Sequence, residues 1–195
     1  MTCQPSLDKH GWLTPLAGVV MHAPSPNHDE RPAGGDISLL VVHNISLPPG
    51  VFGGTEVIDL FLNRLDYDSH SWLDRLRGLR VSAHFFIRRN GLIVQCVSTD
   101  QRAWHAGVSC FAQRERCNDF SIGIELEGTD ELPYTDAQYD ALTTLTSALR
   151  ARYPLQHVRG HEHIAPGRKT DPGLAFDWQR YGAGSGWLPE QLPPA

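Results

Sequence analysis

The stretch ISLLVVH, residues 37–43, indicates the fold more strongly than any other part of the chain. Five of its first six residues are apolar, and His43 stands at its end. A strand without a polar face is typical of a sheet that is covered on both sides. We therefore predict a buried strand here, and we expect the His43 side chain to open onto the rim of the sheet.

Three other segments have the pattern of strands. Residues 81–89 and 92–97 flank Asn90-Gly91, and this dipeptide between two strand-like runs is a strong signal for a β-hairpin. Residues 120–127 also alternate in polarity. The side chains expected on one face of the first run are Val81, Ala83, Phe85 and Ile87. The apolar set of the last run is Phe120, Ile122, Ile124 and Leu126.

Apolar residues recur at helical spacing in two regions. Residues 55–77 have this spacing in two pieces, one around Val57, Leu60 and Phe61 and the other around Trp72, Leu73 and Leu76. Residues 135–153 predict an amphipathic helix that begins with a Thr135–Gln138 capping box and is ended by Pro154. A short strand is expected near residues 157–161.

Strands and helices interleave, while the hairpin requires one antiparallel pair. We therefore predict an α/β fold, a single domain with a mixed central β-sheet flanked by helices, and 195 residues suit one domain. Residues 1–36 are expected to be an irregular lead-in, because prolines forbid a long helix there. The Gly- and Pro-rich tail from Gly182 onward is expected to be loose. The prolines of the lead-in are Pro24, Pro26 and Pro32.

Composition excludes several classes of protein. The formal net charge of −5 and the pI near 6.0 do not fit a basic nucleic-acid-binding surface. No apolar stretch approaches the roughly 18 residues that span a membrane, and the first ten residues do not resemble a secretory signal. The cysteines at positions 3, 96, 110 and 117 are expected to be free thiols in the cytoplasm, although Cys110 and Cys117 could pair.

His43, His161 and Asp171 are candidate metal ligands. Two imidazoles and one carboxylate suit zinc and leave a fourth position open for chemistry. Taken alone, His43 would more often be a core histidine, and Asp171 a turn residue before Pro172. The occurrence of all three together favours a zinc site.

An acid and a cation accompany these ligands. Glu125 and Glu127 share one face of their strand; we expect Glu125 to reach the site, with Gly123 leaving room beside it, and Glu127 to be solvated. A carboxylate near zinc can transfer protons, and Lys169 could stabilise a developing oxyanion, although most lysines are simply solvated. Arg168 is assigned to solvent or to an acidic group of the substrate.

The other histidines give weaker signals. His84 and His105 could line a pocket, where Trp104 could form a stacking wall for a sugar or pack in the core. His163 could compete as a ligand but ranks below His161. The histidines expected on the surface are His10, His22, His28 and His70.

The same segments resemble a known family, the type 2 N-acetylmuramoyl-L-alanine amidases, which are related to the peptidoglycan-recognition proteins. The matching motifs are VVHN at 41–44, VSAHF at 81–85, RAWHAG at 102–107 and SIGIELEG at 121–128. APGRKTDPG at 165–173 narrows the resemblance to the cytosolic AmpD branch. The resemblance covers residues 15–180 as an amidase domain, with 1–14 and 181–195 as peripheral termini.

The resemblance implies a function. It implies zinc held by His43, His161 and Asp171, with Glu125 as the catalytic acid/base and Lys169 as the oxyanion stabiliser. The implied reaction is hydrolysis of the amide between 1,6-anhydro-N-acetylmuramic acid and L-alanine in soluble muropeptides, for cell-wall recycling. The implied substrate contacts are Asn44, Arg80, Trp104, Arg116 and Ala165. We expect a cytoplasmic monomer whose partner is this small-molecule substrate, not nucleic acid or membrane.

One departure and two alternatives accompany this prediction. Glu162-His163 stands where many relatives carry a small residue and then Asp, which leaves the geometry of this loop open. A peptidoglycan-binding module without catalysis could dispense with a zinc ligand, yet all three are present. An amidase for intact cell wall is the other alternative, and a comparison of soluble muropeptide with whole sacculi would distinguish it.

Overall fold

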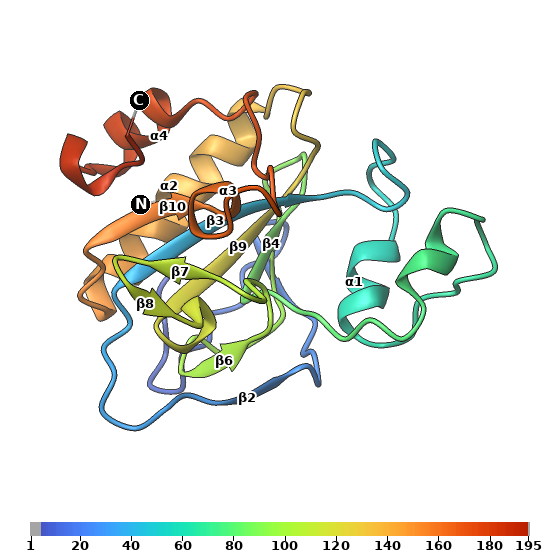
Figure 1. Cartoon of the computed structure of the whole chain (residues 1–195), viewed down its shortest axis with the longest axis horizontal. Helices are drawn as coiled ribbons and strands as arrows, with labels where there is room; N and C mark the ends of the chain where they lie inside the picture. The colour runs from blue at the N-terminus through green and yellow to red at the C-terminus, as the bar shows by residue number, and fades with distance from the viewer. Residues whose placement is uncertain (1–4, 195) are drawn as a thin grey trace.

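The predicted central strand is β3, Leu39–Ile45, in a computed structural model that describes residues 5–194 (Figure 1). It belongs to a six-stranded sheet with the order β1-β5-β4-β9-β3-β10. Strands β4, β9, β3 and β10 run parallel, β5 is antiparallel to β4, and β1 is parallel to β5. The predicted mixed sheet is therefore confirmed. The other bounds are β1 Val20–His22, β4 Phe85–Ile87, β5 Ile93–Gln95, β9 Ser121–Glu127 and β10 His157–Gly160.

The predicted hairpin is formed by β4 and β5, with Phe85 opposite Gln95. The amide of Gly91 donates to the carbonyl of Arg88, and Gly91 has φ +83°, a value that favours glycine. The predicted alternation of faces does not reach back to Val81, because the strand begins only at Phe85. Ala83 consequently packs with Phe86, while Phe85 and Ile87 join the opposite core cluster.

One face of the sheet is covered by α2, Asp136–Arg152. This helix has the predicted capping box, in which the Thr135 hydroxyl accepts from the amide of Gln138. Its buried stripe packs against alternate residues of β3 and β9, and this contact forms the main core. The stripe includes Leu142, Leu145 and Leu149, and the sheet residues include Leu40, Val42, Ile122 and Ile124.

The opposite face is covered in two parts. Helix α1, Glu56–Phe61, and the 3-10 helix η1, Leu73–Leu76, form one core cluster with Phe86 and Val94. Ile164 and Phe120 pack with Leu39 and Val41 in a separate cluster over β3. In Figure 1, α1 lies well to the side of α3, His161–Ile164. The site described below lies between these two parts. The two helical pieces expected in residues 55–77 are thus present but short.

Small sheets and loops complete the fold. Strand β2, His28–Glu30, pairs with β6, Gln101–Ala103, and β7, Cys110–Phe111, pairs with β8, Arg114–Glu115. The 3-10 helix η2 spans Cys117–Asp119. As expected, no helix occurs in residues 5–36, which contain the short strands β1 and β2. Within residues 5–194, no helix is long and apolar enough to cross a bilayer.

The C-terminal segment corrects one prediction. The tail expected to be loose from Gly182 onward instead forms the end of α4, Trp178–Ser185, and the 3-10 helix η3, Pro189–Gln191. Trp187 is only 5% exposed and packs in the main core with Tyr181. Two large aromatic side chains therefore anchor a segment whose glycines and prolines suggested disorder.

The described cysteines carry free thiols. Cys96 and Cys117 are buried and Cys110 is exposed, so Cys110 and Cys117 do not form the disulfide that was left open. Burial raises the pKa of the Cys96 thiol to about 12, which makes it a poor nucleophile. Cys3 lies outside the described residues.

Candidate metal centre and active site

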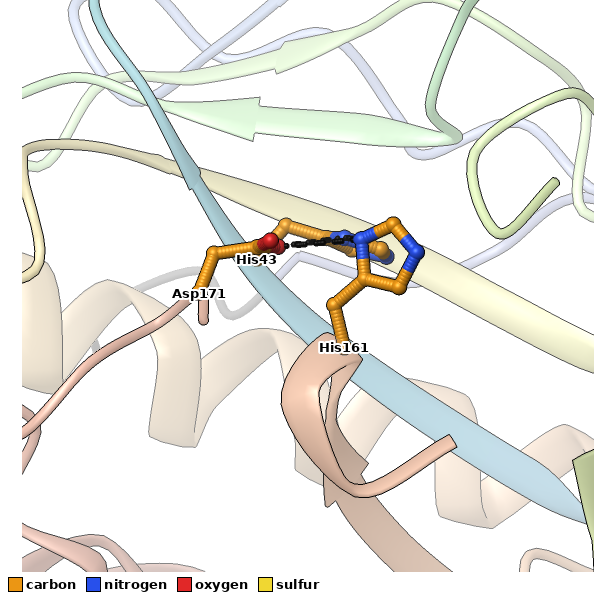
Figure 2. A group of neighbouring side chains, drawn as sticks. All are labelled: His43, His161 and Asp171. Atoms are coloured by element: carbon orange, nitrogen blue, oxygen red, sulfur yellow. Dashed lines mark hydrogen bonds and ion pairs between the residues drawn. The ribbon is translucent and has the colours of Figure 1, made fainter. Parts of the chain in front are cut away.

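Three side chains from distant parts of the sequence converge on one point (Figure 2). Nδ1 of His43 lies 3.0 Å from Nδ1 of His161 and 3.0 Å from Oδ2 of Asp171. Nδ1 of His161 lies 3.1 Å from the same carboxylate oxygen. These are the three ligand candidates named from the sequence, and the fold brings their donor atoms together.

The sheet explains why the two histidines meet. β10 pairs parallel to β3, with Gly160 opposite Val42, so both strands end at the same edge of the sheet. His43 is close to the end of β3, and His161 is the first residue of α3, directly after β10. Asp171 follows on the next loop, and the amide of Glu162 donates to its backbone carbonyl at 3.0 Å.

The three donor atoms fit a zinc ion. A tetrahedral zinc site with bonds of about 2.0–2.1 Å separates neighbouring donors by about 3.3 Å, close to the triangle observed here. Burial lowers the pKa of His43 to about 4, which keeps its imidazole neutral as a ligand must be. Burial opposes ionisation of Asp171, but hydrogen bonding with His161 and His43 outweighs it and lowers the pKa of the carboxyl.

Glu125 stands beside these ligands. It is the register partner of His43 on the adjacent strand β9, so both side chains leave the same face of the sheet. Oε2 of Glu125 is buried and has no hydrogen-bond partner among residues 5–194. Burial raises the pKa of this carboxyl well above its usual range; Asp171 raises it further, and Lys169 opposes the rise. A half-buried carboxyl that lines the cavity and has one oxygen without a hydrogen-bond partner in the described residues suits proton transfer to a molecule bound there.

Glu127 corrects a second prediction, because it is buried and not solvated. Its side chain is 4% exposed. One carboxylate oxygen accepts from the amide of Gly53 at 2.6 Å, and the other accepts from the amide of Arg89 at 2.9 Å. Glu127 therefore joins two loops to the end of β9. The prediction failed because a strand end that looks exposed in sequence is covered by the loop around Gly53.

A cavity of about 630 Å³ opens over these groups. Its polar floor includes Glu125, His161, Asp171 and the exposed Lys169. Within the described part of the chain, the Lys169 ammonium forms no ion pair within 4.0 Å. One wall is apolar and comes from α1, η1 and the segment after them. The residues of this wall include Leu60, Phe61, Trp72, Leu76, Leu79 and Val81.

Comparison with known proteins identifies the family. Residues 33–174 match the family described as N-acetylmuramoyl-L-alanine amidase. The 1,6-anhydro-N-acetylmuramyl-L-alanine amidase AmpD of Citrobacter freundii is 57% identical over 175 residues, covering 89% of this chain and 91% of that protein. The chain belongs to the N-acetylmuramoyl-L-alanine amidase family. Within this family it is an AmpD-type amidase.

Solved amidase structures agree with the fold. A selenomethionine derivative of AmpD matches with a TM-score of 0.86 and 57% identity, covering 91% of this chain and 98% of that one. The amidase AmiD from E. coli, in complex with the substrate anhydro-N-acetylmuramic acid-L-Ala-D-gamma-Glu-L-Lys, matches with a TM-score of 0.55 and 30% identity. That match covers 91% of this chain and 65% of AmiD. The α/β architecture predicted from the sequence is therefore that of this amidase family.

The five substrate-contact candidates of this amidase do not all lie together. Asn44 and Trp104 line the same cavity as the ligands. Ala165 and Arg116 line a separate neighbouring cavity of about 520 Å³. Arg80 is exposed and is not among the residues that line either cavity.

Of the remaining histidines, one lines the cavity and the others lie outside it. His105 lines the cavity, with its pKa held well below the usual value by burial and by His43. His84 is buried behind it and accepts from the amide of Gly123, so it lines no part of this cavity. His163 accepts from the amide of Gly160 and packs on Trp178, outside the ligand cluster. Of the four histidines expected on the surface, His10, His28 and His70 are exposed and His22 is half-buried.

Two residues have roles that the sequence did not reveal. Arg168 is exposed, as expected, but its guanidinium also donates to the carbonyls of Ala106 and Val108 and so fastens the loop of Lys169. Asn118 accepts hydrogen bonds from the amides of His105 and Ala106. Neither contact could be found from sequence spacing, because each joins loops whose relative position depends on the sheet.

Proposed function

We propose that the chain is a zinc-dependent amidase of soluble muropeptides that serves cell-wall recycling. It would hydrolyse the amide between 1,6-anhydro-N-acetylmuramic acid and L-alanine. The observation that carries the proposal is the convergence of the His43, His161 and Asp171 donor atoms beside Glu125, whose Oε2 has no hydrogen-bond partner in residues 5–194. The substrate class is supported by the AmpD relatives and by the anhydro-muropeptide bound to AmiD.

The metal and two side chains of the protein would have separate roles in the reaction. A zinc ion held by the three ligands would supply Lewis-acid activation of the scissile carbonyl. Glu125 would accept a proton from the attacking water and deliver it to the nitrogen of L-alanine as the amide bond breaks. Lys169 would place its positive charge near the carbonyl oxygen, where negative charge develops in the transition state. Its position on the cavity lining supports this role.

The substrate contacts are proposed from the two cavities. The ring of Trp104 would stack on the sugar, and Asn44 would hydrogen-bond polar groups of the substrate near the metal. The Asn44 amide already donates to Asp130 at 2.7 Å, which fixes its orientation. Arg116 and Ala165 would contact the distal part of the stem peptide in the neighbouring cavity. Arg80 is exposed and would contact a part of the substrate that extends out of the cavities. An arginine pairs well with a peptide carboxylate.

Metal removal tests the mechanism. The purified protein is treated with a chelator, dialysed, and assayed on anhydro-N-acetylmuramoyl-tripeptide by chromatography of the released peptide. We expect activity to be lost and to return when one equivalent of zinc is added. Full activity of a preparation shown to be free of metal would contradict the mechanism.

Substrate comparison tests the class of amidase. We expect much faster release of peptide from soluble anhydro-muropeptide than from whole sacculi. Faster release from sacculi would favour an amidase of intact wall, and tight binding without product would favour a recognition module.

We also propose that the enzyme acts in the cytoplasm as a monomer. The free thiols of Cys96, Cys110 and Cys117 fit a reducing compartment. Cell fractionation and sedimentation measurements test these two points.

A further inference from the structure

The two histidine ligands present the same ring nitrogen to the metal position. For both His43 and His161, it is Nδ1 that faces Asp171. The other ring nitrogen, Nε2, points away and contacts a neighbouring loop in each case. Nε2 of His43 lies 2.9 Å from Nδ1 of His105, and Nε2 of His161 lies 3.0 Å from the carbonyl oxygen of Ala106. Two consecutive residues, His105 and Ala106, therefore contact the two histidines on the side of each ring that faces away from the metal position.

The surroundings of His161 suit the tautomer that leaves Nδ1 free to hold a metal. If Nδ1 of His161 holds the metal, its Nε2 carries the hydrogen and donates it to the carbonyl oxygen of Ala106, which can only accept. In the neutral ring, the lone pair is then on Nδ1, where a metal ligand needs it. The Ala106 carbonyl also accepts from Arg168 at 2.8 Å, which limits its freedom to rotate away.

The same reasoning gives a direction to the contacts of His43. If Nδ1 of His43 holds the metal, its Nε2 carries the hydrogen and donates to Nδ1 of His105. His105 must then carry its own hydrogen on Nε2, which lies 3.1 Å from the hydroxyl of Ser121. The result is a chain of hydrogen bonds donated from His43 to His105 and from His105 to Ser121, and all three residues are buried.

Two features hold the dipeptide His105-Ala106 in place. The side-chain oxygen of Asn118 accepts from the amide of His105 at 3.2 Å and from the amide of Ala106 at 2.8 Å. The His105 ring occupies the space above Gly123, where an added Cβ would lie 2.4 Å from Cγ of the ring. The space that was expected to serve Glu125 is therefore filled by His105.

We propose that His105 and Ala106, held by Asn118, are the positioning element that orients both histidine ligands with Nδ1 toward the metal. His105 is a positioning residue, because it acts through His43 and does not contact the substrate in this role. The inference rests on the proposed function, since it concerns how the proposed metal is held. Losses of an outer hydrogen-bond partner of this kind weaken metal binding by about 10- to 100-fold.

The test compares metal affinity in variants of the full chain. His105→Phe keeps a flat ring but removes the acceptor, and His105→Asn restores an acceptor oxygen near the position of Nδ1. The matched control is His84→Phe, which changes a second buried histidine that has no contact with either ligand. Zinc affinity is measured by competition with a chromogenic chelator, and the visible spectrum of the cobalt-substituted protein reports the ligand geometry.

We expect His105→Phe to lower zinc affinity by about 10- to 100-fold and to alter the cobalt spectrum, with His105→Asn recovering part of the affinity. His84→Phe should leave affinity within about threefold of the wild type, whatever its effect on stability. Unchanged affinity and spectrum in His105→Phe would overturn the inference, and so would an equal loss in both phenylalanine variants. A wild-type protein that binds no zinc would instead overturn the proposed function.

Asn118 gives an independent variant pair. Asn118→Ala removes the acceptor for both amides, and Asn118→Asp retains an acceptor oxygen in the same place. We expect a fall in zinc affinity for the alanine variant that the aspartate variant largely reverses. If both variants bind zinc as the wild type does, Asn118 has no part in the positioning element.

Discussion

His43 and Glu125 face each other across adjacent parallel strands, as register partners of β3 and β9. Strands in a sheet lie about 4.8 Å apart, and partners of this kind project their side chains on the same face. The proposed ligand His43 and the carboxyl of Glu125 therefore have a fixed separation that does not depend on a loop. The rigidity of the sheet gives the proposed proton carrier a constant position relative to the metal.

Glu125→Gln should abolish most of the activity without releasing the metal. The amide cannot carry the proton, so we expect kcat to fall by about 10²- to 10⁴-fold. Zinc content, measured by mass spectrometry, should remain at the wild-type level because Glu125 is not a ligand. Loss of zinc from this variant would show that the residue has been given the wrong role.

Glu127→Ala should act on stability. Its carboxylate accepts from the amides of Gly53 and Arg89, and the loss of such charge-assisted bonds costs about 1.5–3 kcal/mol. We expect a lower Tm in thermal unfolding, with zinc affinity unchanged. Glu190→Ala, at an exposed position, is the control and should unfold like the wild type. A Glu127→Ala protein as stable as this control would contradict the structural role.

Gly123→Ala should disturb the metal site from a distance. The new methyl group would overlap the His105 ring, which would have to move away from His43. We expect weaker zinc binding, measured by chelator competition. Gly35→Ala is the matched change, because an added Cβ there meets only the Pro32 carbonyl oxygen at 3.9 Å. Normal zinc affinity in Gly123→Ala would mean that the ring can shift without affecting the ligand.

Trp187→Ala should show that the C-terminal segment is part of the core. The side chain is buried in the main cluster with Tyr181, and removal of a buried Trp costs about 3–5 kcal/mol. We expect denaturant unfolding at a clearly lower midpoint. Leu188→Ala changes the next residue, which is 55% exposed, and should have little effect. Equal stability of the two variants would restore the prediction of a loose tail.

Local patterns predicted local structure well. The capping box of α2 depends on Thr135 and Gln138, which are three positions apart, so the sequence contains all of its chemistry. The continuous apolar run of β3 likewise reports burial on both faces. The hairpin at Asn90-Gly91 was also predicted, although the strands are shorter than their apolar runs because the chain leaves the sheet before Phe85.

Long-range contacts could not be predicted in the same way. The contact between His43 and His161 joins residues 118 positions apart and was predicted from ligand chemistry and family resemblance, not from spacing, while the bond between His43 and His105, 62 positions apart, was not predicted. Such contacts depend on strand order and register, which no local spacing specifies. Trp187 shows the same limit, because its partners in the core lie on other elements.

The sequence by itself determined the kinds of side chain available to the site: two imidazoles and a carboxylate suited to zinc, together with an acid and a lysine. The sequence already favoured Glu125 over Glu127, which share one face of β9, but only the tertiary structure decided what each of them contacts. The register of β9 with β3 places Glu125 opposite His43, while loops from elsewhere supply amides to Glu127. A side chain's chemistry is a property of its residue, but its hydrogen-bond partners are set by the packing of the whole chain.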